Sequence, residues 1–443
     1  MPRRKKEEQP QEEIKTIKTP SMIDGTKDVM PSEAKYWDFL ENQVRSAIHD
    51  YSFIRMRTPV VEKFELFNHT LFKQPGLADR ELFTLIDKGL KVALRPEATS
   101  SVARAFVKHN MINQTMPIKT YCWGPMFRQG KVAPNKLRQF TQASFEIIGD
   151  GAPAIDAELI VVAYNLVHNL GLDVEVILNS LGCVVCRLEY SKSLSGYLKS
   201  KRAGICADCR KKTTKDPLKF LTCTNPKCLR LKEDAPQTVD WLCDECRNHL
   251  FRVLEYLDEL KIPYRLDSSL VRTFDYYNKT VFELRSIEEG ENESVAVAGG
   301  GRYDYLVEMV GGESTPAAGF AVGLERVINL LKTKKVEIPK PAGPDVFVTQ
   351  IGEQARQQIY TFFEILRKEK FTVKGNFSKA SLKAQLDIAI KLNAKFVLIL
   401  GQKEVVENTI LLRDLDSGIQ EVFPRDRVIP EIKKRLREKR KRA

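Results

Sequence analysis

The spacing of hydrophobic residues changes along the first part of the chain and predicts different elements. Apolar side chains in residues 33–50 recur at the three- and four-residue spacing of an amphipathic helix. Residues 54–61 contain a proline and are typical of an extended segment at a strand end or sheet edge. Residues 91–109 predict a strand, a turn and then a helix with Thr99 or Ser100 as its cap.

The stretch 124–149 predicts a β-hairpin whose second arm has two unlike faces. Because the side chains of a strand alternate between faces, one face carries Arg138, Phe140, Gln142, Ser144 and Glu146 in that order. The opposite face becomes apolar toward its far end and can pack against helices. At about 3.3 Å per residue the polar face spans roughly 26 Å, enough for a nucleotide and a small zwitterion end to end. The solvated face of an exposed hairpin would show the same pattern, so the rest of the chain has to decide.

Strand and helix patterns continue through the middle of the chain. A helix is predicted over 153–170 and an apolar strand over 174–182, and residues 264–286 have the character of a hairpin. Residues 295–312 predict a strand that leads into a glycine run and a helix, and 316–331 predict a strand that runs directly into a helix. The glycine run lacks the residue order of a phosphate-binding loop.

The end of the chain predicts a separate α/β domain. Residues 332–345 are rich in lysine and proline and are typical of a linker. The strands predicted beyond it are 346–352, 371–376, 395–401 and 408–414, with helices at 353–368 and 379–392 between the first three. This alternation is expected of a parallel sheet with crossover helices.

Length and composition narrow the class of protein. A chain of 443 residues with 43% hydrophobic residues is expected to be globular and to form two or three domains. No apolar run is long enough for a membrane span, and residues 1–20 lack the apolar segment of a signal peptide, so we expect them to form a disordered tail. The net charge of +13 favours a polyanionic partner or an anionic substrate. The basic run 433–443 is either a solvated tail or a nucleic-acid contact.

Eight of the nine cysteines are clustered, which indicates metal binding. They form the pairs Cys183 and Cys186, Cys206 and Cys209, Cys223 and Cys228, and Cys243 and Cys246. A tetrahedral zinc site takes four thiolates, usually from two such pairs, so eight ligands would serve two sites. The spacing does not say which pairs combine. A redox dithiol is the less favoured alternative, because the pairs stand beside no βαβ pattern.

Several segments together resemble the signature motifs of the histidyl-tRNA synthetase family. They are 94–105, 126–128 with 138–149, 268–284, 298–312 and 317–327. The resemblance extends from residue 25 through the last domain and implies a class II synthetase. Such an enzyme is a homodimer in the cytoplasm, and Pro59 would lie in its dimer-forming first motif.

The resemblance also implies a fold and its division into parts. The expected fold is α+β, with a catalytic core over 21–331 built from an antiparallel sheet flanked by helices. A cysteine-rich helical insertion, residues 183–262, would fold over the acceptor stem of the tRNA and contain structural zinc. After the linker, residues 346–443 would form an α/β anticodon-binding domain with a basic tail.

The activity implied by the resemblance is the ligation of histidine to its tRNA. ATP activates the histidine carboxylate with release of pyrophosphate, so the site has to hold two anions together, and magnesium would bridge the phosphates. Arg128 matches an arginine on the α-phosphate, Arg272 one on the carboxylate and α-phosphate, and Arg326 one on the γ-phosphate. Phe140 would stack under adenine, and Arg138 belongs to the same ATP-binding group.

The resemblance assigns a second group of residues to histidine. Those expected around the α-ammonium group are Glu97, Ala98, Thr99 and Gln142, and those expected around the imidazole are Glu146, Tyr276, Tyr277 and Tyr303. Imidazole offers a donor on one nitrogen and an acceptor on the other, and a carboxylate facing a tyrosine hydroxyl satisfies both.

The chain departs from the family pattern at a few positions, and these departures keep other functions open. Gly130 stands where the family usually has a glutamate that helps to place adenine. The other departures are Ala98, Thr273, Phe274 and Lys279. A histidine-binding regulatory relative with weakened catalysis is therefore an alternative to the ligase. A zinc-dependent RNA-binding adaptor would explain the cysteines and the charge, but it would leave Arg272 unexplained.

Overall fold

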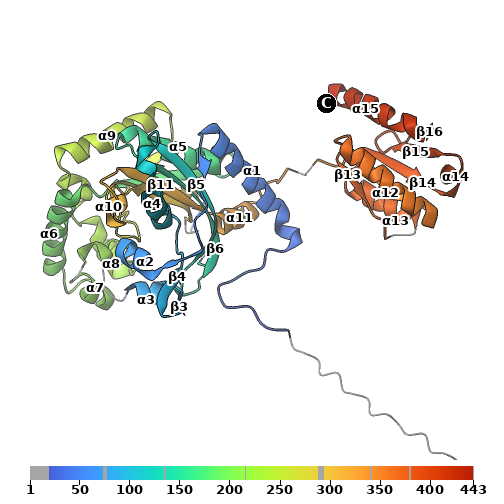
Figure 1. Ribbon diagram of the computed structural model, residues 1–443. Coiled ribbons are helices and arrows are strands. Elements are labelled where there is room, and N and C mark those ends of the chain that lie inside the picture. The colour runs from blue at the N-terminus through green and yellow to red at the C-terminus, as the bar shows by residue number, and fades with distance from the viewer. Residues whose placement is uncertain are drawn as a thin grey trace, which may run out of the picture. The chain divides into compact units, whose positions relative to one another are not determined.

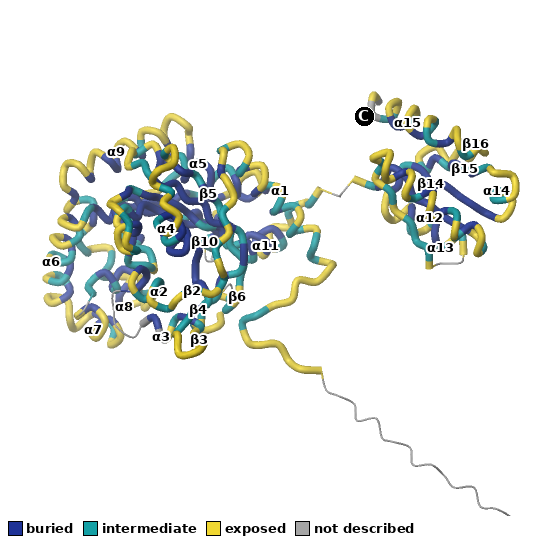
Figure 2. The backbone as a smooth tube through the Cα atoms, in the orientation of Figure 1, coloured by how far each residue is buried: buried dark blue, intermediate teal, exposed yellow. Residues whose placement is uncertain are grey.

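The computed structural model describes residues 19–72, 77–133, 136–214, 216–287, 294–339, 342–378 and 381–442. The chain divides between residues 338 and 339 into two compact units, and each is described by itself (Figure 1). Within each unit the central strands of the main sheet are buried, and the outward faces of the helices are exposed (Figure 2). Across these ranges, none of the helices combines the length and apolar character needed to cross a membrane.

An eight-stranded sheet organises the first unit, in the order β1-β5-β6-β11-β10-β9-β7-β8. Its strands are β1 (Ile54–Arg55), β5 (Ile118–Phe127), β6 (Gln139–Ile148), β7 (Val174–Ser180), β8 (Tyr264–Leu266), β9 (Asn278–Ser286), β10 (Ala296–Arg302) and β11 (Ala317–Gly323). Neighbouring strands from β5 to β7 in this order are antiparallel. The edge strands β1 and β8 run parallel to their neighbours. The expected antiparallel sheet is therefore confirmed, with a parallel strand added at each edge.

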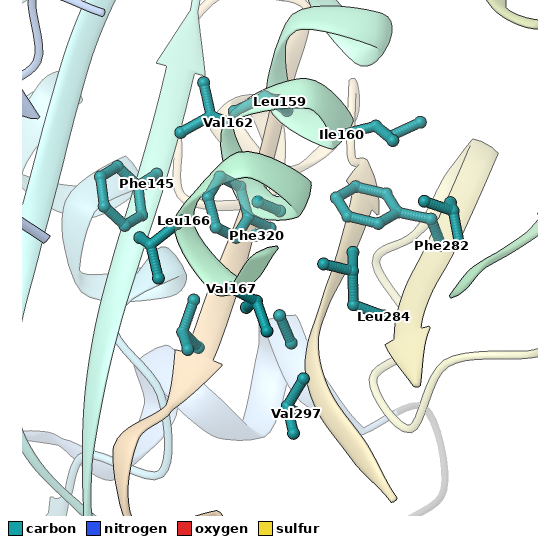
Figure 3. Packing of buried hydrophobic residues seen from close by; sticks show 14 of the residues in the cluster. Phe145, Leu159, Ile160, Val162, Leu166, Val167, Phe282, Leu284, Val297 and Phe320 are labelled. Carbon is teal, nitrogen blue, oxygen red and sulfur yellow. The ribbon is translucent and has the colours of Figure 1, made fainter. Parts of the chain in front are cut away.

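One face of this sheet is covered by three helices. They are α1 (Ala34–Asp50), α5 (Pro153–His168) and α11 (Leu324–Thr333). Phe145 of β6 stacks on Phe320 of β11 with ring centroids 4.8 Å apart. Figure 3 shows α5 lying over these rings with Val162 and Leu166 beside them. The apolar face predicted for the second arm of the hairpin thus packs against helices.

The other face of the sheet carries α4 (Thr99–Lys108) and a small three-stranded sheet. The remaining elements here are β2 (Val61–Lys63), β4 (Leu90–Leu94), β3 (Thr84–Asp87), α2 (Phe64–Leu71), α3 (Leu77–Glu81) and α10 (Leu306–Met309). The carboxylate of Glu97 accepts the backbone N–H groups of Thr99 and Ser100 at the start of α4. The predicted cap at Thr99 or Ser100 is wrong, because the long Glu97 side chain reaches these N–H groups first.

The cysteine-rich segment, residues 183–262, is helical and lies between β7 and β8. They are α6 (Val184–Ser200), α7 (Ala207–Lys212), α8 (Pro226–Glu233) and α9 (Asp244–Glu259), with 3-10 helices η3 (Pro217–Phe220) and η4 (Thr238–Trp241). The side chains of α6, α7 and η3 share a core of their own that includes Leu194 and Phe220. By contrast, α9 packs into the core beneath α5 through Leu250 and Val253.

The second unit is an α/β domain with a five-stranded sheet in the order β13-β12-β14-β15-β16. Its elements are β12 (Val346–Gln350), α12 (Glu353–Lys368), β13 (Val373–Gly375), α13 (Leu382–Lys391), β14 (Phe396–Leu400), α14 (Gln402–Val406), β15 (Thr409–Asp414), β16 (Gln420–Pro424) and α15 (Arg425–Arg442). The first three strands are parallel, as predicted, and the last two are antiparallel. The basic run 433–443 is helical up to Arg442, and Leu436 within it is buried.

Candidate active site and metal centres

The polar face of β6 points toward α4 and is buried at its far end. Glu146 lies opposite Gly319 of β11 and Thr120 of β5, and only 1% of it is exposed. A Cβ atom at Gly319 would come within 1.8 Å of Glu146 Oε2, so glycine is required to leave room for this carboxylate. The polar face is therefore the lining of an interior site and not the solvated side of a hairpin.

The Glu146 carboxylate is held by two hydroxyl groups. Thr99 donates a hydrogen bond to Oε1 at 2.8 Å, and Tyr303 donates to Oε2. Burial raises the pKa of Glu146 to about 8, although both hydroxyl groups lower it. Each carboxylate oxygen has a second lone pair, so Glu146 can still accept an N–H group from a ligand.

Three tyrosines stand beside Glu146. The Tyr276 ring lies 4.5 Å from that of Tyr277 and 5.5 Å from that of Tyr303, measured between centroids. The Tyr276 hydroxyl donates to the Tyr277 hydroxyl at 3.5 Å. Burial raises the pKa of all three phenols, so they remain neutral groups that can donate or accept a hydrogen bond.

Next along the polar face are the groups expected around an ammonium ion. Within the part of the chain that the structure describes, Gln142 Oε1 is buried and has no hydrogen-bond partner. Burial also raises the pKa of Glu97, which caps α4 nearby. A buried acceptor without a partner is costly, and an ammonium ligand would satisfy it. Ala98 has φ −99°, so alanine in place of the usual glycine causes no strain.

Three arginines gather at the other end of this site. Burial lowers the pKa of Arg128; Glu97 opposes this effect, while the cations Arg326 and Arg272 lower the pKa further. Arg272 Nη1 donates to Glu283 Oε1 at 2.7 Å. A Cβ atom at Gly299 would lie 2.5 Å from Arg272 Nη1, so the glycine run makes room for this guanidinium. Burial, and after it Arg272, also lower the pKa of Arg326. Neighbouring buried cations of this kind favour an anionic ligand.

The Arg128 guanidinium lies between two aromatic rings. Its central carbon is 5.1 Å from the Phe140 centroid and 5.3 Å from the Phe274 centroid, and Nε donates to the Pro96 carbonyl at 3.2 Å. Phe274 was noted in the sequence only as a departure from the family pattern. Here it holds Arg128 over the ring that was expected to support adenine.

Arg138 and Gly130 meet in the loop between β5 and β6. Arg138 Nε donates to the Gly130 carbonyl at 3.3 Å, and its backbone N–H donates to the Gly25 carbonyl at 2.8 Å. A Cβ atom at Gly130 would lie 3.7 Å from Glu81 Oε2. The carboxylate of Glu81 therefore stands beside the position where the family usually has a glutamate.

The eight cysteines form two groups of four. The outer tetrad is Cys183, Cys186, Cys243 and Cys246, and the inner tetrad is Cys206, Cys209, Cys223 and Cys228. All Sγ atoms of a tetrad lie within 4.8 Å of one another. The Sγ atoms of Cys183 and Cys186 lie 3.6 Å apart, and those of Cys206 and Cys223 lie 3.9 Å apart. Tetrahedral zinc with bonds of about 2.3 Å requires edges of about 3.8 Å, so each tetrad fits one metal ion.

Backbone N–H groups point at the sulfur atoms of both tetrads. In the outer tetrad the N–H of Cys183 donates to Cys246 Sγ at 3.2 Å, and that of Cys243 donates to Cys186 Sγ at 3.1 Å. Burial raises the pKa of Cys183, but hydrogen bonds led by the Cys186 N–H outweigh it and lower the pKa to about 7. Such donors favour the thiolate form that binds metal.

Comparison with known proteins agrees with this arrangement. Residues 25–327 match the family described as histidyl-tRNA synthetase, and residues 345–435 match the anticodon binding domain. A histidine–tRNA ligase of Halothermothrix orenii is 37% identical over 412 residues, which cover 93% of this chain and 98% of the relative. One of Caldanaerobacter subterraneus is 39% identical over 396 residues, with 89% and 94% covered. The crystal structure of apo S. aureus histidyl-tRNA synthetase matches with a TM-score of 0.77 and 30% identity, over 94% of this chain and 100% of that one.

Proposed function

This chain belongs to the histidyl-tRNA synthetase family and is a histidine–tRNA ligase, and we propose that it activates L-histidine with ATP in the pocket between β6, α4 and β9. One observation carries the assignment of this pocket. A buried carboxylate with two hydroxyl donors lies at one end of the polar face of β6, and three arginines gather at the other. That order matches histidine placed with its imidazole at the first end and its carboxylate next to the α-phosphate of ATP.

The histidine end would select its substrate by hydrogen bonding. Glu146 accepts an N–H of the imidazole, and a hydroxyl of the tyrosine group (Tyr276, Tyr277 and Tyr303) serves its other nitrogen. The α-ammonium group donates to Gln142 Oε1 and to Glu97, beside Ala98 and Thr99. An apolar side chain in this pocket would leave buried polar groups without partners, and such sites reject analogues strongly.

The arginine end would carry out the transfer by positioning and charge. The histidine carboxylate attacks the α-phosphorus, pyrophosphate leaves, and Arg128 and Arg272 stabilise the negative charge that develops. Arg326 would hold the γ-phosphate, while Arg138 and Phe140 would hold the rest of the nucleotide. Magnesium, when bound, neutralises the phosphates, and the pocket offers Glu283 as an oxygen ligand of the type it prefers.

The second step would transfer histidine to the 3′-terminal ribose of the histidine tRNA. The hydroxyl attacks the activated carbonyl and AMP leaves, so orientation of the two substrates supplies most of what is needed. The match of residues 345–435 to an anticodon-binding domain and the net charge of +13 both support tRNA as the partner.

We further propose one structural zinc ion in each tetrad and a homodimer in the cytoplasm. Four thiolates at zinc-like spacing support the first part of this proposal. Exposed apolar side chains on the edge strand β1 and on β3 support a covered surface: they are Ile54, Leu85 and Ile86. Metal analysis should return two zinc ions per chain, and light scattering should give twice the 50.6 kDa of one chain.

Neither alternative function is favoured by these observations. The regulatory relative would not need the arginine group, yet Arg272 is seated in a gap made by Gly299. The RNA-binding adaptor would not need the buried hydrogen bonds around Glu146.

Histidine-dependent exchange of labelled pyrophosphate into ATP tests the proposal. We expect the unaltered protein to exchange with histidine and with no other amino acid. Arg272→Ala and Glu146→Gln should each reduce kcat/KM by at least about a hundredfold. The first removes a buried cation, and the second replaces an oxygen that accepts a hydroxyl hydrogen bond with an NH₂ group. Arg265→Ala is the matched control, since this arginine of β8 is half-exposed and pairs with Glu175 at the surface. Histidine binding without any exchange would support the regulatory alternative instead.

A further inference from the structure

Each of the three C-x-x-C pairs is followed directly by an arginine, namely Arg187, Arg210 and Arg247. The three have the same backbone setting. Their N–H groups donate to the carbonyl of the first cysteine of the pair at 3.0, 3.0 and 2.9 Å, respectively. Because the local turns are alike, the three side chains can be compared directly.

Two of these side chains stabilise their own turn. Arg210 Nε donates to the carbonyl of Ile205 at 3.1 Å, and Arg247 Nη2 donates to the carbonyl of Leu242 at 3.1 Å. Ile205 and Leu242 each stand immediately before the first cysteine of their pair. In this turn the arginine side chain therefore bonds to the carbonyl before the cysteine pair when that carbonyl has no other donor among the described residues.

Arg187 makes a different contact. The residue before its cysteine pair is Gly182, whose carbonyl accepts the N–H of Lys279 at 2.9 Å. Arg187 Nη1 donates instead to the carbonyl of Tyr277 at 3.3 Å. Tyr277 immediately precedes β9, and Lys279 is the second residue of that strand.

The Tyr277 residue connects this arginine to the pocket. Its ring lies 5.6 Å below the Arg272 guanidinium, and its hydroxyl accepts a hydrogen bond from Tyr276. Residues 276–279 are called the tyrosine segment below. A second backbone hydrogen bond, from the Leu181 N–H to the Lys279 carbonyl at 2.7 Å, joins this segment to the turn before Cys183. The first turn of the outer tetrad and the tyrosine segment thus form one hydrogen-bonded unit.

We propose that Arg187 is a positioning residue for histidine binding: by holding the Tyr277 carbonyl it sets the placement of the Tyr276–Tyr277 pair against the imidazole. This inference rests on the pocket assignment above. It predicts a selective effect, because Arg187 contacts the backbone of the tyrosines directly and reaches the phosphate-holding Arg272 only through the Tyr277 ring. The outer tetrad serves the pocket through this arginine, whereas the equivalent arginine of the inner tetrad serves only its own turn.

The test compares Arg187→Ala and Arg187→Lys with Arg210→Ala and Arg247→Ala in pyrophosphate exchange. We expect the KM for histidine to rise about tenfold in Arg187→Ala, the scale of one charge-assisted hydrogen bond. The kcat and the KM for ATP should change by less than about twofold, a split that general destabilisation would not give. Arg187→Lys should recover part of the loss, since lysine keeps one donor. The two control variants should match the unaltered protein.

Calorimetric titration with histidine and no ATP keeps this test separate from catalysis. If the unaltered protein binds histidine but exchanges nothing, the catalytic assignment fails while the comparison of histidine affinities still decides the role of Arg187. An unchanged histidine affinity in folded Arg187→Ala would overturn the proposal. An equal loss in Arg247→Ala would also overturn it, because the effect would then belong to the cysteine turns in general.

Discussion

The two cysteine tetrads have the same ligands and similar sulfur spacing, but they are built into different parts of the molecule. Cys186 and Cys246 belong to the large core under α5, together with Leu250 of α9. Cys209 and Cys228 belong to a separate, smaller core within the cysteine-rich segment. The difference comes from their positions in the chain. The outer tetrad joins the start of the segment, directly after β7, to the start of α9, and the inner tetrad closes a loop between them.

This difference teaches that a repeated metal-binding motif takes its role from what lies next to it. A Cβ atom at Gly182 would come within 2.4 Å of Cys186 Cβ, and Gly182 has φ +65°, so the outer turn is pressed against the end of β7. The strand β9 pairs with β7 and directly follows Tyr276 and Tyr277. The core of the inner tetrad meets the site at a different place, through Val271 beside Arg272. We therefore expect the outer tetrad to support catalysis and the inner one to shape the cysteine-rich segment, which we propose contacts the tRNA.

The largest expected effect comes from removing one ligand from each tetrad in turn. Cys246→Ser should abolish histidine-dependent pyrophosphate exchange and lower the Tm, because binding of structural zinc contributes about 10 kcal/mol or more to the fold around it. Cys228→Ser should keep the exchange reaction and lose mainly the transfer to tRNA. Metal analysis should show one zinc ion fewer in each variant.

Equal loss of pyrophosphate exchange in both variants would contradict the different roles of the two tetrads. In that case the cysteine-rich segment would fold as one cooperative unit with the core, and the separate inner core would have no functional meaning. Circular dichroism of both variants at the assay temperature shows whether either has simply unfolded.

A smaller effect is expected on stability when the pH is changed. It sharpens the comparison because the titrating group, Glu146, lies in the pocket and not at either tetrad. The pKa of Glu146 is raised from 4.5 to about 8 in the folded protein, chiefly by burial, so the folded state holds this proton more tightly than the unfolded state. The resulting stability is complete below pH 4.5 and is lost as the pH rises through about 8. The unfolding free energy should fall by roughly 2 to 5 kcal/mol over this window.

Glu146→Gln should remove the contribution of this carboxyl group to the pH dependence of the Tm. The plot of Tm against pH should therefore become flatter but should not change sign. Cys228→Ser should keep the full slope, since the inner tetrad does not contact Glu146. A profile for Glu146→Gln that matches the unaltered protein would show that other buried groups, such as Glu97, account for the slope.

Much of the pocket could be predicted from the sequence because strand geometry is simple. The period of two placed Glu146 and Gln142 on one face of β6, and the structure has them there. The identity of the neighbours across the sheet could not be predicted in this way. Gly319 and Gly299 make room for a carboxylate and a guanidinium. The register of β11 on β6 sets the first of these contacts, and the loop before β9 brings Arg272 to the second.

Other features were missed because their signal is weak or shared. The pairing of the cysteines could not be predicted, since three of the four pairs have identical spacing. The helix α15 was missed because its many charges hide the apolar positions, although Val428, Ile432 and Leu436 recur every fourth residue and are all buried. Arg187 was missed because it looks like one of three equivalent arginines until the Tyr277 carbonyl is placed beside it.

The smallest expected effect comes from the second side-chain contact between the outer tetrad and the tyrosine segment. Lys279 Nζ pairs with Glu245 Oε1 at 3.0 Å, but the Glu245 side chain is 79% exposed. Exposed ion pairs contribute about 0.2 to 1 kcal/mol, so Glu245→Gln should raise the KM for histidine by no more than about twofold. Exchange assays at low and high salt measure this directly. If Glu245→Gln instead equalled Arg187→Ala and its effect vanished in high salt, the tetrad would act on the pocket through surface charge. A salt-independent excess for Arg187→Ala would assign that action to the buried Tyr277 carbonyl, the contact that the inner tetrad lacks.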